Sequence, residues 1–318
     1  MIWGKEMFSE KLKELDSFSR FMETMKFNEN FISNLIEQAF GKPIICLSKK
    51  STHIFDTLFL KTAKRTLNSI LICCSYGSFA DSNVLIRKYR DDLFLYLFIL
   101  EVLNNRKGLT DNEISQITQG EMDADRLYHI VVSTIGVISG GWRKDRNDKA
   151  VDAWFDNEAS TGKFKKELSI NNYLNYLKRN SEIEKCIMEH GLNDLWEEIR
   201  VRLNDYTHAN GKKFLEHNLL ERLSSEEINE CIRQISERVS FITSVFLVFL
   251  ILIKPDIIMA SDYLDSVELG LKPPKDSQYW VAPFIIEYID QIVVKFHPEL
   301  KVFLHQNNKY GMLIESNS

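Results

Sequence analysis

Residues 193–211 read NDLWEEIRVRLNDYTHANG and have the pattern of an amphipathic helix. Apolar side chains recur at intervals of three and four residues, which places them along one face of a helix. These apolar residues are Leu192, Leu195, Trp196, Ile199, Leu203 and Tyr206. Asn193 can cap the start of the helix, and Gly211 is suited to end it. The segment therefore predicts a helix that packs through its apolar face.

Three polar residues of the same helix form a ridge beside that face. Arg202, Asp205 and His208 are spaced at i, i+3 and i+6. A carboxylate in this position can orient an imidazole, while a guanidinium can pair with a phosphate through two donors. These groups would suffice for phosphodiester chemistry without a metal. The alternative is a solvated row of side chains that only supports the helix.

The composition favours a mainly α-helical protein. The 318 residues include only 13 Gly and 6 Pro, and 44% of them are hydrophobic, which is ample for a sizeable core. The net charge of −5 gives no general basic surface, so a contact with nucleic acid would need a local patch. No Gly-rich phosphate loop or Cys-x-x-Cys pair occurs. We therefore expect neither a cofactor nor a metal.

Two features favour a cytoplasmic protein. The five cysteines do not form a disulfide framework, and the N-terminus lacks the apolar run of a signal peptide.

The one membrane candidate, residues 239–253, spans about 22 Å at about 1.5 Å per residue, short of a hydrocarbon core of about 30 Å. We expect a buried central helix and no stable membrane insertion. A membrane-embedded segment is the alternative, because Lys254 could snorkel.

Further helices are expected along the chain. Helical periodicity predicts them over residues 5–40 (one or two helices), 52–76, 83–103, 110–119, 123–138, 149–159, 170–190, 224–253, 278–296 and 298–307. Gly77 ends the helix over 52–76, and Asp81 or Ser82 can cap the next one. Residues 104–108 are expected to form a turn.

The helix over residues 83–103 carries charges on an otherwise apolar sequence. Arg87, Arg90 and Asp91 fall within one sector of the helix, with Glu101 further along it, and Arg87 and Asp91 form an i, i+4 pair. Charges on a buried helix must be paired or used, because leaving one unpaired costs several kcal/mol. The sector is therefore either a buried ion pair that fixes the helix register or part of a site.

The order of these features resembles the HEPN superfamily of helical bundles. The resemblance rests on a long helix with a basic outer face, a turn, a helix with an Arg-x-x-Arg-Asp core, and a later helix that ends in DYTHANG. Ribonuclease members carry an Arg-x4-6-His motif at a helix end, and Arg202 and His208 fit this spacing. The resemblance covers about residues 52–253, with an insertion near 105–190. It implies an all-α, HEPN-like helical bundle over 51–253 with helical additions at 1–50, within the bundle and at 254–318.

The resemblance also implies an activity. The chain would be a metal-independent endoribonuclease, a defence or toxin effector, in which His208 is the general acid or base and Arg202 stabilises the phosphorane charge. Asp205 would orient His208. The residues expected to contact the RNA substrate are Arg87, Arg90, Asp91, Asn204 and Tyr206.

Two other functions are open. Leu203 follows Arg202 where active members usually have a polar residue, which suits a non-catalytic helical binding or scaffolding protein of the same fold. A membrane-active toxin that uses residues 239–253 is the other.

Family members are often dimers whose motifs face each other. Because a twofold axis would bring two ridges together into one basic cleft, we expect a homodimer with RNA as its partner.

Overall fold

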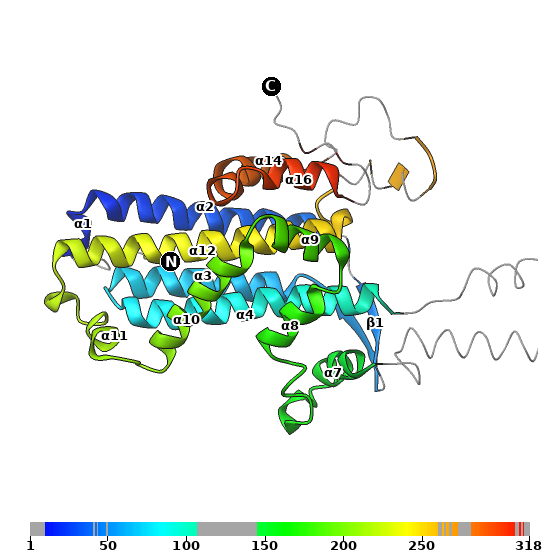
Figure 1. The fold of residues 1–318 in the computed structure, drawn as a ribbon, viewed down its shortest axis with the longest axis horizontal. Coiled ribbons are helices and arrows are strands. Elements are labelled where there is room, and N and C mark those ends of the chain that lie inside the picture. The colour runs from blue at the N-terminus through cyan, green and yellow to red at the C-terminus, as the bar shows by residue number, and fades with distance from the viewer. Residues whose placement is uncertain are drawn as a thin grey trace, which may run out of the picture. The chain divides into compact units, whose positions relative to one another are not determined.

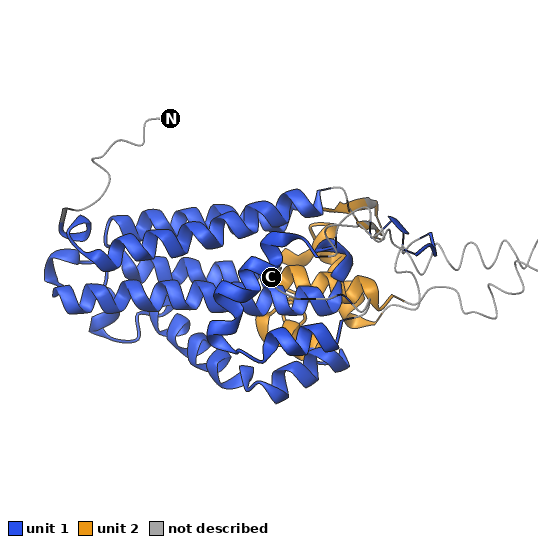
Figure 2. Ribbon diagram, turned by 90° about the horizontal axis from the view of Figure 1, so that it is seen from above, with its two compact units in different colours: residues 1–41, 57–94, 178–318 blue, residues 42–56, 95–177 orange. Residues whose placement is uncertain are grey.

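The computed structural model describes residues 10–40, 42, 44–48, 50–106, 145–259, 263, 265–266, 269–272, 281–308, 312 and 314. These residues are predominantly helical and include one two-stranded sheet, which agrees with the predicted all-α class. The helices expected over 110–119 and 123–138 lie outside the described residues. The chain divides into two compact units, one of residues 1–41, 57–94 and 178–318, the other of residues 42–56 and 95–177 (Figure 2).

The first unit is a bundle of long helices. Its helices are α1 (Glu10–Lys13), α2 (Asp16–Ala39), α3 (Leu58–Ser75), α9 (Ser181–Glu189), α10 (Leu192–Thr207), α11 (Lys212–Glu216), α12 (Ser225–Ile253), α14 (Pro283–Tyr288), α15 (Val294–Phe296) and α16 (Leu300–Gln306). Residues 79–94 of α4 (Phe79–Asn104) also belong to it. Figure 1 shows α2 lying beside α12, and α2 is in contact with both α12 and α3.

Helix α12 is the central helix of this unit. It begins with a capping box, in which the Ser224 hydroxyl accepts from the backbone of Glu227 and the Glu227 carboxylate accepts from the backbone of Ser224. Every residue from Arg238 to Ile253 is buried. On α2, the Asn28 side-chain amide donates to the Ser240 hydroxyl of α12 at 3.1 Å. The prediction of a buried central helix is confirmed.

Helices α4 and α12 pack in parallel. Their contacts pair Asn83 with Arg238, Tyr89 with Thr243, and Phe94 with Phe249. Because the residue numbers of the contacting residues rise together along both helices, the two helices run in the same direction. The Tyr89 hydroxyl lies 2.7 Å from the Thr243 hydroxyl, which satisfies both buried polar groups.

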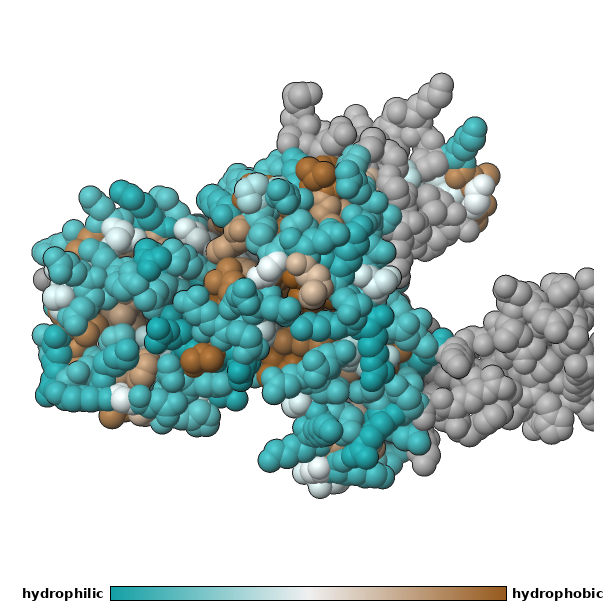
Figure 3. Space-filling view, viewed as in Figure 1, coloured by the Kyte–Doolittle hydropathy of each residue, from teal (hydrophilic) through white to brown (hydrophobic). Residues whose placement is uncertain are grey.

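The apolar part of α12 is covered by protein. Helix Ser225–Ile253 is long and apolar enough to cross a membrane, but 89% of its most apolar window is buried. On the face shown in Figure 3, hydrophilic residues cover most of the described surface and hydrophobic residues appear in smaller patches. The structure is therefore consistent with a soluble fold, in which α12 is a core helix.

The second unit contains the sheet and shorter helices. Strand β1 (Ile44–Leu47) pairs antiparallel with β2 (Thr52–Phe55), and the unit also includes residues 95–104 of α4, α7 (Arg146–Phe155) and α8 (Ile170–Leu177). Aromatic rings fill its core. Phe98 stacks on Tyr173 at a centroid distance of 4.9 Å, and Phe55 stacks on Tyr96 at 5.0 Å.

The predicted helix over residues 52–76 starts too early, because its first residues form a strand. Thr52 and Ile54 are β-branched and favour extended backbone. The Ser48 hydroxyl accepts from the backbone N–H groups of Lys50 and Ser51, which closes the hairpin turn. Helix α3 therefore begins at Leu58, after the hairpin.

The predicted helix over residues 170–190 is two helices. Helix α8 ends at Leu177, and the Asn180 side chain accepts from the backbone N–H groups of Glu182 and Ile183 at the start of α9. This side-chain cap competes with continuation of the helix, so the chain starts a new one. The expected helix over 278–296 is also interrupted. It consists of α14, a π-helical turn over Ile289–Val293, and α15.

Two predicted caps are wrong. Helix α4 begins at Phe79, before both Asp81 and Ser82, and the Asn218 side chain accepts from the backbone N–H groups of Ala80 and Asp81. A residue distant in sequence thus caps this helix. Helix α10 follows Gly191, and the Asn193 side chain accepts from Lys178 instead of capping.

Candidate functional site

The predicted ridge lies at the C-terminal end of α10. Helix α10 ends at Thr207, and His208 is its C-cap residue, with its backbone N–H bonded to the carbonyl of Asn204 at 3.0 Å. Ala209 then adopts the left-handed conformation with φ of +48°, which turns the chain away before Gly211. Helix α10 therefore ends earlier than the predicted stop at Gly211, and His208 lies at the turn.

Two of the three ridge residues are in contact. Arg202 Nη1 lies 4.0 Å from Asp205 Oδ2, and the Arg202 side chain is 49% exposed. His208 is also exposed. The Asp205 carboxylate accepts from the Asn210 side-chain amide at 3.2 Å, and among the described residues it makes no hydrogen bond to His208. The expected orientation of His208 by Asp205 is not seen, because His208 lies outside the regular helix.

A cavity of about 470 Å³ lies beside this ridge, within the first unit. Its walls come from α10, α11, α12 and α15, together with His217. The lining residues are Leu195, Glu198, Ile199, Arg202, Tyr206, Lys213, Phe214, His217, Arg233, Gln234, Glu237, Arg238, Phe241 and Phe296. Arg202 and Tyr206 are thus brought together on one wall, whereas His208 and Asn204 are not part of the lining.

Arg238 is the buried cation of this cavity. Its residue is 8% exposed, and its guanidinium donates to Asn83 Oδ1 at 2.5 Å and to Gln234 Oε1 at 2.7 Å. The guanidinium carbon also lies 5.9 Å from the centre of the Tyr206 ring. All three partners are neutral. Burial lowers the pKa of Arg238, but an arginine remains charged at any working pH.

The other cations of the wall differ in their pairing. Arg233 contacts both Glu230 and Glu237 at 2.7 Å, so its charge is compensated. Lys213 is exposed, and its Nζ lies 5.0 Å from the centre of the Phe214 ring. Within the part of the chain that the structure describes, the ion pair of Arg202 is the long contact with Asp205. Among the lining residues, four cations outnumber the two carboxylates, Glu198 and Glu237, and this excess of positive charge favours an anionic ligand.

Tyr206 and His217 share a hydrogen bond on the cavity wall. The Tyr206 hydroxyl lies 2.9 Å from His217 Nδ1, and Cys231 Sγ lies 3.7 Å from the same nitrogen. Burial lowers the pKa of His217 and raises the pKa of Tyr206. Burial also raises the pKa of the Cys231 thiol to about 12. All three groups are therefore neutral at pH 7, and Cys231 has no thiolate to act as a nucleophile.

In the charged sector of α4, Asp91 pairs with Arg90 as well as with Arg87, its predicted partner. Arg90 is 1% exposed and donates through Nε and Nη2 to Asp91 Oδ1 at 2.9 and 2.7 Å. Arg87 Nε lies 3.9 Å from Asp91 Oδ2. Arg90 also lies over the Trp196 ring, 5.7 Å from its centre. None of these residues lines the cavity, so the predicted substrate-binding residues do not form one site with Tyr206.

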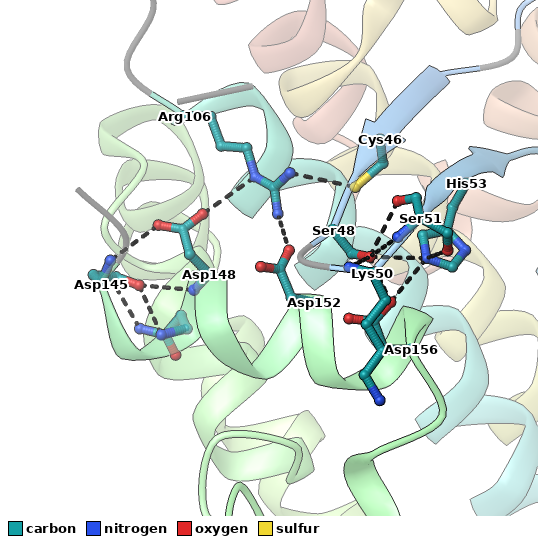
Figure 4. A network of polar contacts seen from close by, with 11 residues as sticks. Cys46, Ser48, Lys50, Ser51, His53, Arg106, Asp145, Asp148, Asp152 and Asp156 are labelled. Atoms are coloured by element: carbon teal, nitrogen blue, oxygen red, sulfur yellow. Dashed lines mark hydrogen bonds and ion pairs between the residues drawn. The ribbon is translucent and has the colours of Figure 1, made fainter. Parts of the chain in front are cut away.

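The second unit holds a separate polar cluster, shown in Figure 4. His53 Nε2 lies 3.1 Å from Ser48 Oγ, 2.9 Å from Ser51 Oγ and 3.1 Å from Asp156 Oδ1. Nucleophilic catalysis by such a set needs the serine and the aspartate on opposite ring nitrogens. Because all three partners share Nε2, this cluster connects the hairpin to the chain after α7 and does not activate a serine.

An arginine binds two carboxylates in the same unit. Arg106 Nε lies 3.3 Å from Asp148 Oδ1, and its Nη2 lies 3.0 Å from Asp152 Oδ1. The guanidinium also donates to Cys46 Sγ of β1 at 3.3 Å (Figure 4). Through Arg106, two residues after the end of α4, these contacts join α7 to β1, which is a structural role.

The sequence pattern does not predict that Lys213, His217 and Arg238 line a cavity together with Arg202. Lys213 and His217 follow the predicted stop at Gly211 and belong to a short helix and its C-cap. Arg238 directly precedes the apolar run over residues 239–253. An arginine at the start of an apolar run is the one sequence feature that points to Arg238, because a charge beside buried residues needs polar partners.

No protein-family model, curated protein or solved structure matches the chain.

Proposed function

We propose that the chain is a metal-independent endoribonuclease of the HEPN type, with Arg202 and His208 as its catalytic pair. The observation that carries the proposal is the placement of both side chains on the exposed surface at the end of α10. Arg202 also lines a cavity with an excess of positive charge. An exposed imidazole and a guanidinium beside such a wall can approach the phosphodiester of a single RNA strand.

The proposed reaction is cleavage by the RNA's own 2′-hydroxyl. One imidazole takes the 2′-hydroxyl proton as the 2′-oxygen attacks phosphorus, and the bond from phosphorus to the 5′-oxygen breaks. A second imidazole gives a proton to the departing 5′-oxygen. Arg202 stabilises the charge that develops on the phosphorane oxygens. The products are a 2′,3′-cyclic phosphate and a 5′-hydroxyl.

Two imidazoles at one site call for two chains. Each chain supplies one His208, and in a twofold dimer the partner's His208 would take the second role. The dimer also explains how an exposed His208 would become desolvated enough for catalysis. Light scattering at micromolar concentration should give the mass of two chains. A monomer that cleaves RNA through His208 would contradict the dimer and leave the ribonuclease proposal intact.

The test of catalysis uses purified full-length protein and total RNA in EDTA. Wild type should produce fragments that end in a 2′,3′-cyclic phosphate. His208→Ala should lower the rate by about 100-fold or more, the scale of acid–base catalysis, and Arg202→Ala by a similar factor. Arg20→Ala changes an exposed arginine on α2 and should leave the rate unchanged. Equal rates for wild type and His208→Ala would overturn the assignment.

A second candidate is a non-catalytic RNA-binding protein of the same fold. The observation that favours it is the Asp205 carboxylate, which contacts Arg202 and Asn210 and leaves His208 without the expected acid. This candidate predicts RNA binding without cleavage in the same assay. Growth arrest on expression in the cytoplasm, lost in His208→Ala, would favour the defence or toxin effector instead.

A further inference from the structure

We propose that the cavity beside α10 binds an organic phosphate monoester with an aromatic body. The phosphate would lie by Arg202, Lys213 and Arg238, and the aromatic body would pack against Tyr206 and Phe214. This inference concerns a small ligand and goes beyond RNA cleavage. It rests on the lining of the cavity, of which His208 is not a member.

The charge of the wall selects the anion. Arg238 is buried, and the two side chains that accept its hydrogen bonds, Asn83 and Gln234, are neutral, so neither of them compensates its charge. A buried cation is unfavourable until an anion approaches it. Arg202 is half exposed and can turn towards a ligand, and a guanidinium binds a phosphate through two parallel hydrogen bonds. A dianionic phosphate suits this wall better than a single carboxylate.

Volume and apolar lining select the rest of the ligand. The cavity of about 470 Å³ is in the size range of small-molecule sites, and an inorganic phosphate would leave most of it empty. Tyr206 and Phe214 pack edge to face on one side with ring centres 4.8 Å apart. Phe241 and Phe296 do the same with ring centres 5.5 Å apart. These rings offer apolar contact for a planar group.

One wall residue opposes the anion. Glu198 is an exposed carboxylate of α10, and no cation among the described residues is paired with it. Glu237, in contrast, is bound by Arg233. Removing the Glu198 charge should therefore tighten phosphate binding, whereas most substitutions in a binding site weaken it. This opposite sign gives the proposal a sharp test.

The experiment is calorimetric titration of the purified full chain with phenyl phosphate, with phenol and inorganic phosphate as separate arms. Phenyl phosphate should bind at least about tenfold more tightly than either part alone. Arg202→Ala and Lys213→Ala should each weaken binding by about tenfold, because each removes a charged partner of the phosphate. Both residues are exposed, so these variants should fold. Glu198→Gln should tighten binding by about threefold.

Two variants separate this inference from the proposed ribonuclease. His208→Ala should lower the cleavage rate by about 100-fold or more and leave phenyl phosphate binding unchanged, because His208 is not in the lining. Arg20→Ala should change neither. Phenyl phosphate that binds no more tightly than inorganic phosphate would overturn the proposal. So would binding that survives both Arg202→Ala and Lys213→Ala, since the ligand would then lie elsewhere.

Discussion

The hydroxyl of Tyr206 on α10 lies 2.9 Å from Nδ1 of His217, the residue that ends α11. Because burial holds both groups in their neutral forms, the bond is an ordinary neutral hydrogen bond. Tyr206→Phe should therefore lower the free energy of unfolding by about 1 kcal/mol, the usual contribution of such a bond. Urea unfolding of the purified variant measures this change.

His217→Gln provides the second arm of a double-mutant cycle with Tyr206→Phe. If the two residues interact only through this bond, the double variant should lose less than the sum of the two single losses. Strict additivity would show that the hydrogen bond contributes nothing to stability.

Gly77, in the turn between α3 and α4, requires a glycine for two reasons. Its φ is +79°, and a Cβ atom there would lie 2.7 Å from the Cβ of Leu220. Gly77→Ala should lower the free energy of unfolding by about 2–4 kcal/mol, combining left-handed strain with overpacking. Gly191 in the same unit is the control, because it has φ of +58° and no atom within 4 Å of the added Cβ. Gly191→Ala should cost about 1 kcal/mol. Equal losses in the two variants would contradict the contact with Leu220.

The parts of the fold that were predicted from sequence depend on local signals. Ser224 and Glu227 are three residues apart, and their capping box fixes the start of α12 without help from the rest of the chain. The uncharged run that follows is long enough to identify a core helix. By contrast, the hairpin over 44–55 was missed. Its second strand continues directly towards α3, and the apolar spacing from Phe55 to Leu58 and Phe59 also fits a helix.

The candidate site could be predicted only in part for the same reason. Arg202 and Tyr206 belong to one helix, so helical spacing placed them correctly. Arg238 donates to Asn83, which is 155 residues away in the chain, and no local pattern records this contact. The Asn218 cap of α4 is likewise formed by a residue more than a hundred positions distant. Such contacts follow from tertiary packing.

The Arg90–Asp91 pair on α4 should respond unequally to loss of its two members. Arg90 is 1% exposed, so Asp91→Ala leaves a buried cation whose main partner is gone. Since Asp91 itself is 37% exposed, the loss should be moderate, about 2 kcal/mol of unfolding free energy. Arg90→Met keeps an apolar side chain against Trp196 and removes the buried charge, so it should cost less. Chemical unfolding of the two variants gives the free energy of unfolding that each one loses. A larger loss in Arg90→Met than in Asp91→Ala would contradict the expected order.

His190, the C-cap of α9, should make the fold sensitive to mild acid. It is 6% exposed, and its ring packs edge to face against His297 and Phe303 at centre distances of 5.4 and 5.3 Å. Both ring nitrogens lack a hydrogen-bond partner among the described residues. Burial first, and His297 second, lower the pKa of His190 below its ordinary value of 6.5, while Glu189 and Glu299 oppose the shift.

The sign of the effect follows from proton uptake. Between the folded pKa and 6.5 the unfolded chain binds a proton at His190 that the folded chain does not, so stability rises with pH in that window. The contribution is complete above pH 6.5 and is lost as the pH falls through the unfolded pKa towards the folded one. One such group changes the unfolding free energy by at most about 1.4 kcal/mol per pH unit. His217 also has a lowered pKa and acts in the same direction, but it is present in wild type and variant alike.

His190→Phe keeps an aromatic ring against Phe303 and cannot take up a proton. Urea unfolding at pH 7.5 and pH 5 should therefore show a smaller loss of stability in the variant than in wild type. The difference between the two losses isolates His190, because every other titrating group is shared. Equal losses in the two proteins would mean that the pKa of His190 is the same in the folded and the unfolded chain, which would contradict the lowering of this pKa by burial.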